Sequence, residues 1–170
     1  MIKLINGRGQ VGRILKEKIN NLNIDDKIYI YHTWNIENKT KEAQFKEHEK
    51  FINFVNQKLD ERIVFISTSS QKDNWYTFYK HLSEAYLLSI NKNSVVVRLP
   101  SLIGKGTCAK FKNNTIEPFG VMELMSVEDA VDVILEKITT PKVVNSYHIK
   151  GERVTAKMVQ QLISFGKDNG

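Results

Sequence analysis

Apolar residues along this chain form short runs, separated by longer stretches in which they recur every three or four positions. The short runs lie over 1–5, 27–32, 62–67, 94–98 and 146–149, and each has the length of a β-strand. The longer stretches predict helices over 11–19, 40–59, 75–90, 129–138 and 155–165. Because strand and helix alternate along most of the chain, we predict an α/β, Rossmann-like parallel sheet with right-handed crossovers and helices on both faces.

The 170 residues contain no internal repeat, low-complexity segment or linker, so we expect a single domain over 1–170. No apolar run approaches the length of a membrane span, and the N-terminus lacks the apolar stretch of a signal peptide. A single cysteine, Cys108, excludes an intrachain disulfide and suits a reducing compartment. These features predict a cytoplasmic protein without a membrane partner. No cluster has metal-ligand spacing, so no metal is expected.

The formal net charge of +6 raises the question of nucleic-acid binding. Between residues 39 and 50, however, lysines are interspersed with glutamates, which is typical of a solvated helix face. The chain also lacks a nucleic-acid recognition motif. We therefore expect no nucleic-acid partner, while the positive excess favours a small anionic ligand such as a phosphorylated cofactor.

The segment 7–12, Gly-Arg-Gly-Gln-Val-Gly, follows the first predicted strand and opens the first helix. In this context glycines allow a tight turn and a close approach to a diphosphate, and the free N–H groups of the helix start supply donors. A plain glycine-rich turn is the alternative. Arg8 and Arg13 suit a 2′-phosphate as well as a surface role, so both NAD and NADP stay open. The predicted cofactor contacts here are Gly7, Arg8, Gly9, Gln10, Val11 and Gly12.

Tyr76 and Lys80 lie four residues apart, on one face of the predicted helix 75–90. A nearby ammonium favours the phenolate and lowers the tyrosine pKa, so Tyr76 would act as general acid or base on a sugar hydroxyl or carbonyl. Lys80 would also donate to ribose hydroxyls. Ser69 follows a buried strand, where α/β proteins collect their chemistry, and would polarise a substrate oxygen. Helix capping is the alternative role for Ser69 and suits Ser70.

Taken in order, these features resemble the short-chain dehydrogenase/reductase superfamily, most closely its extended branch of NAD-dependent epimerases and dehydratases that modify nucleotide-linked sugars. The resemblance implies an NAD(P)-dependent cytoplasmic enzyme of polysaccharide biosynthesis that acts on a nucleotide sugar. It also implicates Pro100, in the loop that passes the nicotinamide end of the cofactor. The stretches that carry the resemblance are 2–13 (first βα turn), 65–70 (serine-bearing strand), 76–80 (YxxxK helix), 95–106, 126–130 and 147–151.

The chain departs from the family in its length. The missing part corresponds to a βαβα segment between the first helix and the strand 27–32, so the fold is expected to be truncated. The acidic residue that holds the adenosine ribose belongs to an absent strand. Asn6 stands where the family has its first loop glycine, and the substrate-binding portion is reduced to about 101–125. His32, at a strand end, is either a cofactor contact or a hydrogen-bonded structural histidine.

Two functions follow from these observations. The leading hypothesis is epimerisation, dehydration or reduction of a nucleotide-linked sugar with NAD or NADP, using Ser69, Tyr76 and Lys80. The alternative is a trimmed, non-catalytic family member that works as a nucleotide-binding or partner subunit. The resemblance further implies a possible homodimer that pairs through the helices 41–59 and 75–90.

Overall fold

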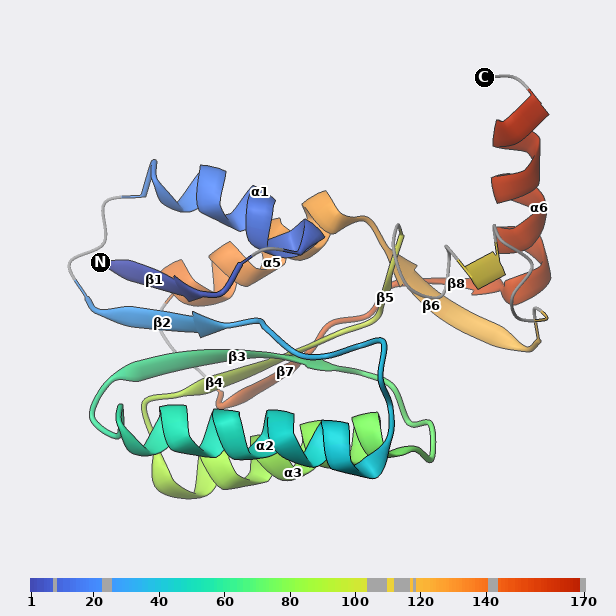
Figure 1. Ribbon diagram of the computed structural model, residues 1–170. Coiled ribbons are helices and arrows are strands. Elements are labelled where there is room, and N and C mark those ends of the chain that lie inside the picture. Colours follow the sequence, from blue (N-terminus) through green and yellow to red (C-terminus); the bar gives the residue numbers. More distant parts are fainter. Residues whose placement is uncertain are drawn as a thin grey trace.

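The computed structural model describes the chain apart from residues 8, 23–25, 104–109, 112–116, 118, 141–143 and 169–170. Five parallel strands form the larger sheet (Figure 1), which confirms the predicted Rossmann-like architecture. Its strands, in their order across the sheet, are β1 (Ile2–Ile5), β2 (Ile28–Tyr31), β3 (Arg62–Thr68), β4 (Val95–Leu99) and β7 (Ser146–His148).

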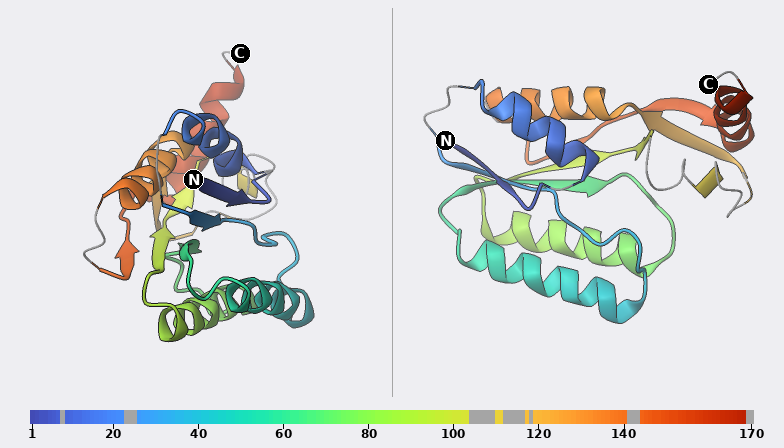
Figure 2. Two further views of the ribbon diagram at one scale, coloured as in Figure 1. Left: turned by 90° about the vertical axis from the view of Figure 1, so that its left-hand side faces the viewer. Right: turned by 45° about the horizontal axis from the view of Figure 1, so that its top comes forward.

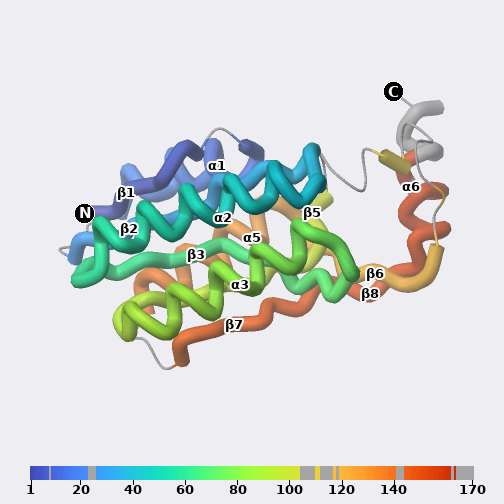
Figure 3. The backbone as a smooth tube through the Cα atoms, turned by 60° about the horizontal axis from the view of Figure 1, so that its bottom comes forward, coloured from blue at the N-terminus to red at the C-terminus, as the bar shows by residue number. Residues whose placement is uncertain are grey.

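Helices cover both faces of this sheet. α1 (Gln10–Ile19) and α5 (Val127–Thr139) lie on one face, and α2 (Lys41–Asn56) and α3 (Trp75–Ile90) lie side by side on the other (Figures 1 and 3). Alternate residues of each strand point to opposite faces, so Ile30 packs toward α1 and α5 whereas Tyr31 packs toward α2 and α3. The sheet is therefore the central layer between two apolar cores.

The crossovers between strands differ in hand. Sheet order equals chain order, so every crossover steps in the same direction across the sheet. Since α2 and α3 lie on one face and α1 and α5 on the other, the two pairs have opposite hands. Viewed along the strands (Figure 2), the connections through α2 and α3 are right-handed and those through α1 and α5 are left-handed. The prediction of right-handed crossovers is thus wrong for β1 to β2 and for β4 to β7.

The left-handed crossover through α1 is what removal of a βαβα segment between α1 and β2 produces. If further strands lay beyond β1, the connection through α1 would lead to a strand on that side and would be right-handed. Without them, α1 stays on the same face of the sheet, but the chain continues to β2 on the opposite side of β1. Among the described strands β1 has one neighbour, so it forms the edge of the sheet. The strand expected to carry an acidic ribose-binding residue is thus not among the described strands.

A smaller sheet extends from the C-terminal end of the larger one (Figure 1). Its strands are β5 (Ser101–Leu102), β6 (Val121–Met125) and β8 (Glu152–Thr155), and α6 (Ala156–Asp168) follows. Phe111, Ala156 and Val159 form its own small core. The chain thus returns to this region after β7, a feature that the sequence did not indicate. Within the described residues, no helix is long and apolar enough to cross a membrane.

Candidate functional site

The predicted site residues gather at the carboxyl ends of the parallel strands β1 to β4, which all point to the same end of the larger sheet. Tyr76 and Lys80 come from the first turns of α3, which begins at the same end. Arg8 and Cys108 lie outside the described residues. The remaining predicted residues are Gly7, Gly9, Gln10, Val11 and Gly12 after β1, His32 after β2, Ser69 after β3 and Pro100 after β4.

The glycine loop brings the end of β1 and the first turn of α1 into direct backbone contact. A Cβ on Gly12 would lie 2.5 Å from Cα and C of Gly7, so only glycine fits there. Asn6 takes the left-handed conformation, with a φ of 56°, which asparagine tolerates better than most residues. Val11 is buried in the core, so it is available to a ligand only through its backbone.

Gly9, unlike Gly12, is exposed and leaves open space at the start of α1. It is the N-cap residue of α1 and provides no side-chain cap, so the first N–H groups of the helix are not covered from this position. A Cβ on Gly9 would meet Cε1 of His32 at 3.4 Å, an ordinary contact. The loop therefore offers backbone donors and an open face, as a bound diphosphate requires.

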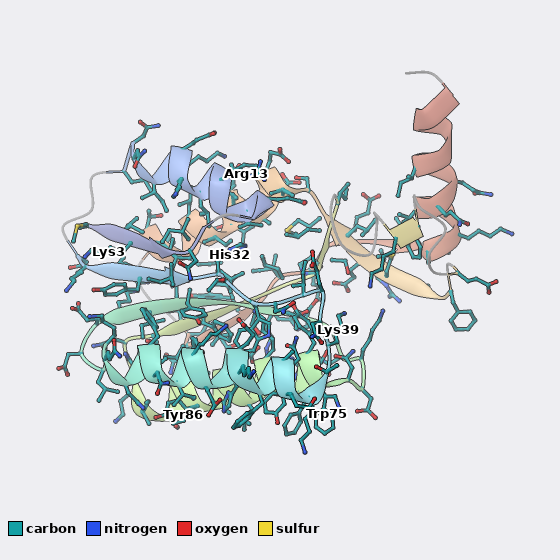
Figure 4. All side chains as sticks on the ribbon, viewed as in Figure 1. Lys3, Arg13, His32, Lys39, Trp75 and Tyr86 are labelled. Carbon is teal, nitrogen blue, oxygen red and sulfur yellow. The ribbon has the colours of Figure 1, made fainter. Side chains whose placement is uncertain are left out.

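His32 lies beside this open face (Figure 4). Burial lowers its pKa to about 4, and the positive charge of Lys80 acts in the same direction. The imidazole is consequently neutral near pH 7 and adds no charge to the glycine loop. Both open interpretations of His32, a cofactor contact and a structural histidine, are compatible with this position.

Lys80 is fully enclosed by protein, with 3% of its surface exposed. Its Nζ donates to the Ile66 carbonyl at 2.7 Å and lies 4.8 Å and 4.7 Å from the ring centroids of Trp34 and Phe65. Burial lowers the pKa of Lys80 to about 7, and the carboxylates of Glu84 and Glu47 act against this shift. A lysine that exchanges its proton near neutral pH is typical of functional sites.

Tyr76 differs from the prediction in one respect. Burial raises its pKa to about 12, with a hydrogen bond to the Thr68 side chain acting in the opposite direction, whereas the sequence predicted a pKa lowered by Lys80. The reason is geometric: among the described residues, the Lys80 ammonium contacts the Ile66 carbonyl and two aromatic rings rather than the phenol.

Positive charge gathers around the Tyr76 ring. The Nζ of Lys39 lies 5.1 Å from the ring centroid. Burial lowers the pKa of Lys39, and the charges of Lys110 and Lys72 lower it further. This part of the site favours an anionic ligand.

The serines after β3 have distinct environments. The N–H of Ser69 donates to the Leu99 carbonyl at 2.9 Å, which fixes its backbone between the ends of β3 and β4. The alternative role of Ser70 as a cap of α3 is wrong: the cap is Asn74, whose side chain accepts from the Thr77 N–H at 3.0 Å. The Ser70 hydroxyl instead accepts from the Lys72 N–H in the preceding loop.

Sequence reasoning missed two groups that shape the site. Glu84 is buried and accepts from the Ser67 hydroxyl and from Arg98, whose Nε lies 2.8 Å from Glu84 Oε2. Trp34 lies over Lys80 because its indole N–H donates to Gln44 Oε1 at 2.7 Å. The spacing of Lys80 and Glu84 by four residues was the available signal for the first group; nothing in the pattern marked Trp34.

A pocket of about 480 Å³ lies beside the glycine loop, at the ends of β1 and β2 and against α2. It combines aromatic walls with polar groups. Its lining residues are Ile5, Asn6, Tyr31, Thr33, Trp34, Asn35, Glu47, Lys50 and Phe54.

No protein-family model and no curated protein sequence matches this chain. Solved structures do match it. A UDP-glucose 4-epimerase from Thermotoga maritima, determined with UDP-glucose, is 14% identical with a TM-score of 0.72 and covers 96% of this chain and 81% of its own. The Bordetella bronchiseptica enzyme WbmG, determined with NAD and UDP, is 13% identical with a TM-score of 0.73, over 97% and 77% of the two chains.

A dTDP-4-dehydrorhamnose reductase from Clostridium acetobutylicum is 16% identical with a TM-score of 0.70, over 96% of this chain and 80% of its own. At these identities the similarity concerns the fold. It confirms at that level the resemblance to extended short-chain dehydrogenases/reductases that the sequence motifs indicated.

Proposed function

We propose that this chain binds NAD or NADP at the strand ends of its larger sheet and modifies a nucleotide-linked sugar by epimerisation, dehydration or reduction. The observation that carries the proposal is the glycine loop, where the close contact of Gly7 and Gly12 leaves the start of α1 open beside Gly9. Neighbours with this fold were determined with NAD and with UDP or UDP-glucose. When bound, the nicotinamide would accept or donate a hydride.

The glycine loop fits the pyrophosphate of such a cofactor. Backbone groups of Gly7, Gly9, Gln10, Val11 and Gly12 would hold it, and Arg8 belongs to the same set. We propose that His32 and Pro100 contact the cofactor toward its nicotinamide end, and that Lys80 binds the ribose next to it. The adenosine side lacks its usual strand, so we expect weaker cofactor binding than in a full-length sheet.

Ser69, Tyr76 and Lys80 supply the chemistry in this proposal. The phenol of Tyr76, with its raised pKa, is protonated at neutral pH and would donate its proton to a developing sugar alkoxide. For the reverse transfer its pKa must fall. We propose that Lys80 then turns from the Ile66 carbonyl toward Tyr76, while the Ser69 hydroxyl polarises the reacting oxygen.

The lysines around Tyr76 support a nucleotide-linked substrate. Lys39, Lys72 and Lys110 place positive charge where an incoming diphosphate would lie. We expect the substrate to be such a nucleotide sugar, in the cytoplasm and in polysaccharide biosynthesis.

Turnover of UDP-glucose and dTDP-glucose by wild type, Tyr76→Phe and Tyr79→Phe tests this function. Removal of the Tyr76 hydroxyl should lower kcat by about 100-fold or more, because the proton donor is lost. Tyr79→Phe removes the same atom three residues away in a packed aromatic cluster and should keep its activity. Equal turnover by Tyr76→Phe and wild type would refute the assigned role.

The edge position of β1 favours a second candidate, a non-catalytic subunit that binds a nucleotide. Under this alternative, the wild type binds NADH or UDP but turns over neither sugar nucleotide. The two candidates are separated by measuring binding and turnover on the same preparation.

We also propose that the protein forms a homodimer through α2 and α3. Four large apolar side chains on these helices are 42–54% exposed, a patch that a partner would cover: Phe45, Trp75, Phe78 and Leu82. Sedimentation should show a dimer for wild type and a monomer for Phe78→Glu, and a monomeric wild type would contradict the pairing.

A further inference from the structure

The pocket beside the glycine loop has the chemistry of a nucleoside site. Its volume of about 480 Å³ lies within the range of small-ligand pockets. Tyr31, Trp34 and Phe54 provide flat apolar surfaces for a base, and Asn6 provides an amide group for its edge. The Asn35 side-chain oxygen already accepts from two backbone N–H groups, so Asn35 would contribute its amide NH₂. Asn6 also begins the glycine loop, so the pocket and the proposed diphosphate site are continuous along the chain.

Glu47 places a carboxylate in this pocket. Its side chain is 12% exposed, and one oxygen, Oε1, accepts from Lys50 at 2.7 Å. Its negative charge adds to burial in raising the pKa of Tyr31, and it acts against the burial that lowers the pKa of Lys80. A largely buried carboxylate that lines a pocket is suited to accept hydrogen bonds from vicinal hydroxyl groups.

We infer that this pocket holds a nucleoside attached to the diphosphate on the glycine loop, and that Glu47 binds its ribose hydroxyls. The site is formed by α2 and by the residues that follow β1 and β2, and so it needs no strand beyond the sheet edge. This inference rests on the proposed function for the diphosphate on the glycine loop and for the assignment of the nucleoside to the adenosine half of the cofactor.

Glu47 also predicts a cofactor preference. A 2′-phosphate would bring negative charge toward the Glu47 carboxylate, and Lys50, already paired with Glu47, would offset this only in part. We therefore assign the pocket to NAD rather than NADP, and Glu47 becomes the residue that distinguishes the two.

Calorimetric titration of wild type, Glu47→Gln and Glu42→Gln with NADH, NADPH, ADP, UDP and reduced nicotinamide mononucleotide tests the inference. Glu47→Gln should weaken the binding of NADH and of ADP by about tenfold, because a charge-assisted hydrogen bond is lost. It should leave the mononucleotide, which lacks the second nucleoside, unchanged. Glu42→Gln makes the same chemical change at an exposed site on α2 and should change none of these affinities.

A second readout does not depend on the Glu47 variant. In a Trp75→Phe protein the remaining tryptophan is Trp34, which lines the pocket, and ADP should quench its fluorescence. Equal affinity of wild type and Glu47→Gln for ADP and NADH, or unchanged Trp34 emission at saturating ADP, would overturn the nucleoside site.

The outcomes separate the inference from the proposed function. If the affinity for UDP, and not that for ADP, depended on Glu47, the assignment of the pocket to the cofactor would be overturned. If the affinity for ADP depended on Glu47 while Tyr76→Phe kept full activity, the inference would be supported and the proposed catalytic role of Tyr76 would be refuted.

Discussion

Lys80 holds an ammonium between two aromatic rings and a backbone carbonyl, in a part of the core that solvent does not reach. Burial lowers its pKa from 10.5 to about 7, although two carboxylates act against the shift. Since the lysine has its ordinary pKa in the unfolded state, burial of its ammonium lowers the free energy of unfolding. Groups kept at such a cost are concentrated at functional sites.

At the residue scale this cost can be measured. The unfolded state binds more protons than the folded state between about pH 7 and 10.5, so the Lys80 contribution to stability increases with pH across that window and is lost as the pH falls. The free energy of unfolding of wild type minus that of Lys80→Met should therefore increase from pH 7 to pH 9. Urea unfolding at both pH values measures it, with exposed Lys46→Met as control; a pH-independent difference would contradict the buried ammonium.

Arg98 and Glu84 give a second residue-scale prediction. Arg98→Met would leave the buried Glu84 carboxylate with the Ser67 hydroxyl and the nearby Lys80 charge, at a cost of about 2 kcal/mol. Adding Glu84→Gln removes the uncompensated charge and should restore part of that loss. Thermal unfolding of the two single variants and the double variant completes the cycle, and additive effects would mean that the pair does not interact.

At the element scale, the approach of β1 to α1 depends on one glycine. A methyl group on Gly12 would lie 2.5 Å from the Gly7 backbone, whereas one on Gly9 meets nothing closer than 3.4 Å. Gly12→Ala should therefore cost about 2 kcal/mol or more of stability, and Gly9→Ala less than about 1 kcal/mol. Similar melting temperatures for the two variants would show that the loop relaxes and does not fix the start of α1.

The sequence predicted the elements of the larger sheet closely, because long helices and buried strands carry clear periodicity. It did not predict the left-handed crossover through α1, since periodicity shows which residues are apolar but not which face of the sheet a helix covers. It also missed β5, β6 and β8, whose residues are exposed or half-buried and therefore form no buried apolar run. It did not identify Asn74 as the cap of α3, because serine and asparagine both suit a cap and the alternative considered was a serine.

At the scale of the whole molecule, the parallel order of the strands made the position of the site predictable. Strand ends that share an edge bring Gly9, His32 and Ser69 to the same side without any knowledge of side-chain packing. The direction of the Lys80 ammonium was not predictable, because it depends on Trp34 from the loop after β2 and on the Gln44 side chain that holds it. The catalytic roles of Ser69, Tyr76 and Lys80 stay predictions.

The central claim is that the glycine loop holds a nicotinamide cofactor although the sheet ends at β1. NADH fluorescence titration of wild type, Gly9→Ala and Gly9→Val tests it most directly. We predict millimolar or tighter binding by wild type and a loss of about tenfold or more in Gly9→Val, whose branched side chain would fill the space between α1 and His32. Gly9→Ala should retain most of the affinity. Absence of millimolar binding of both NADH and NADPH, or equal NADH affinity in wild type and Gly9→Val, would contradict the claim.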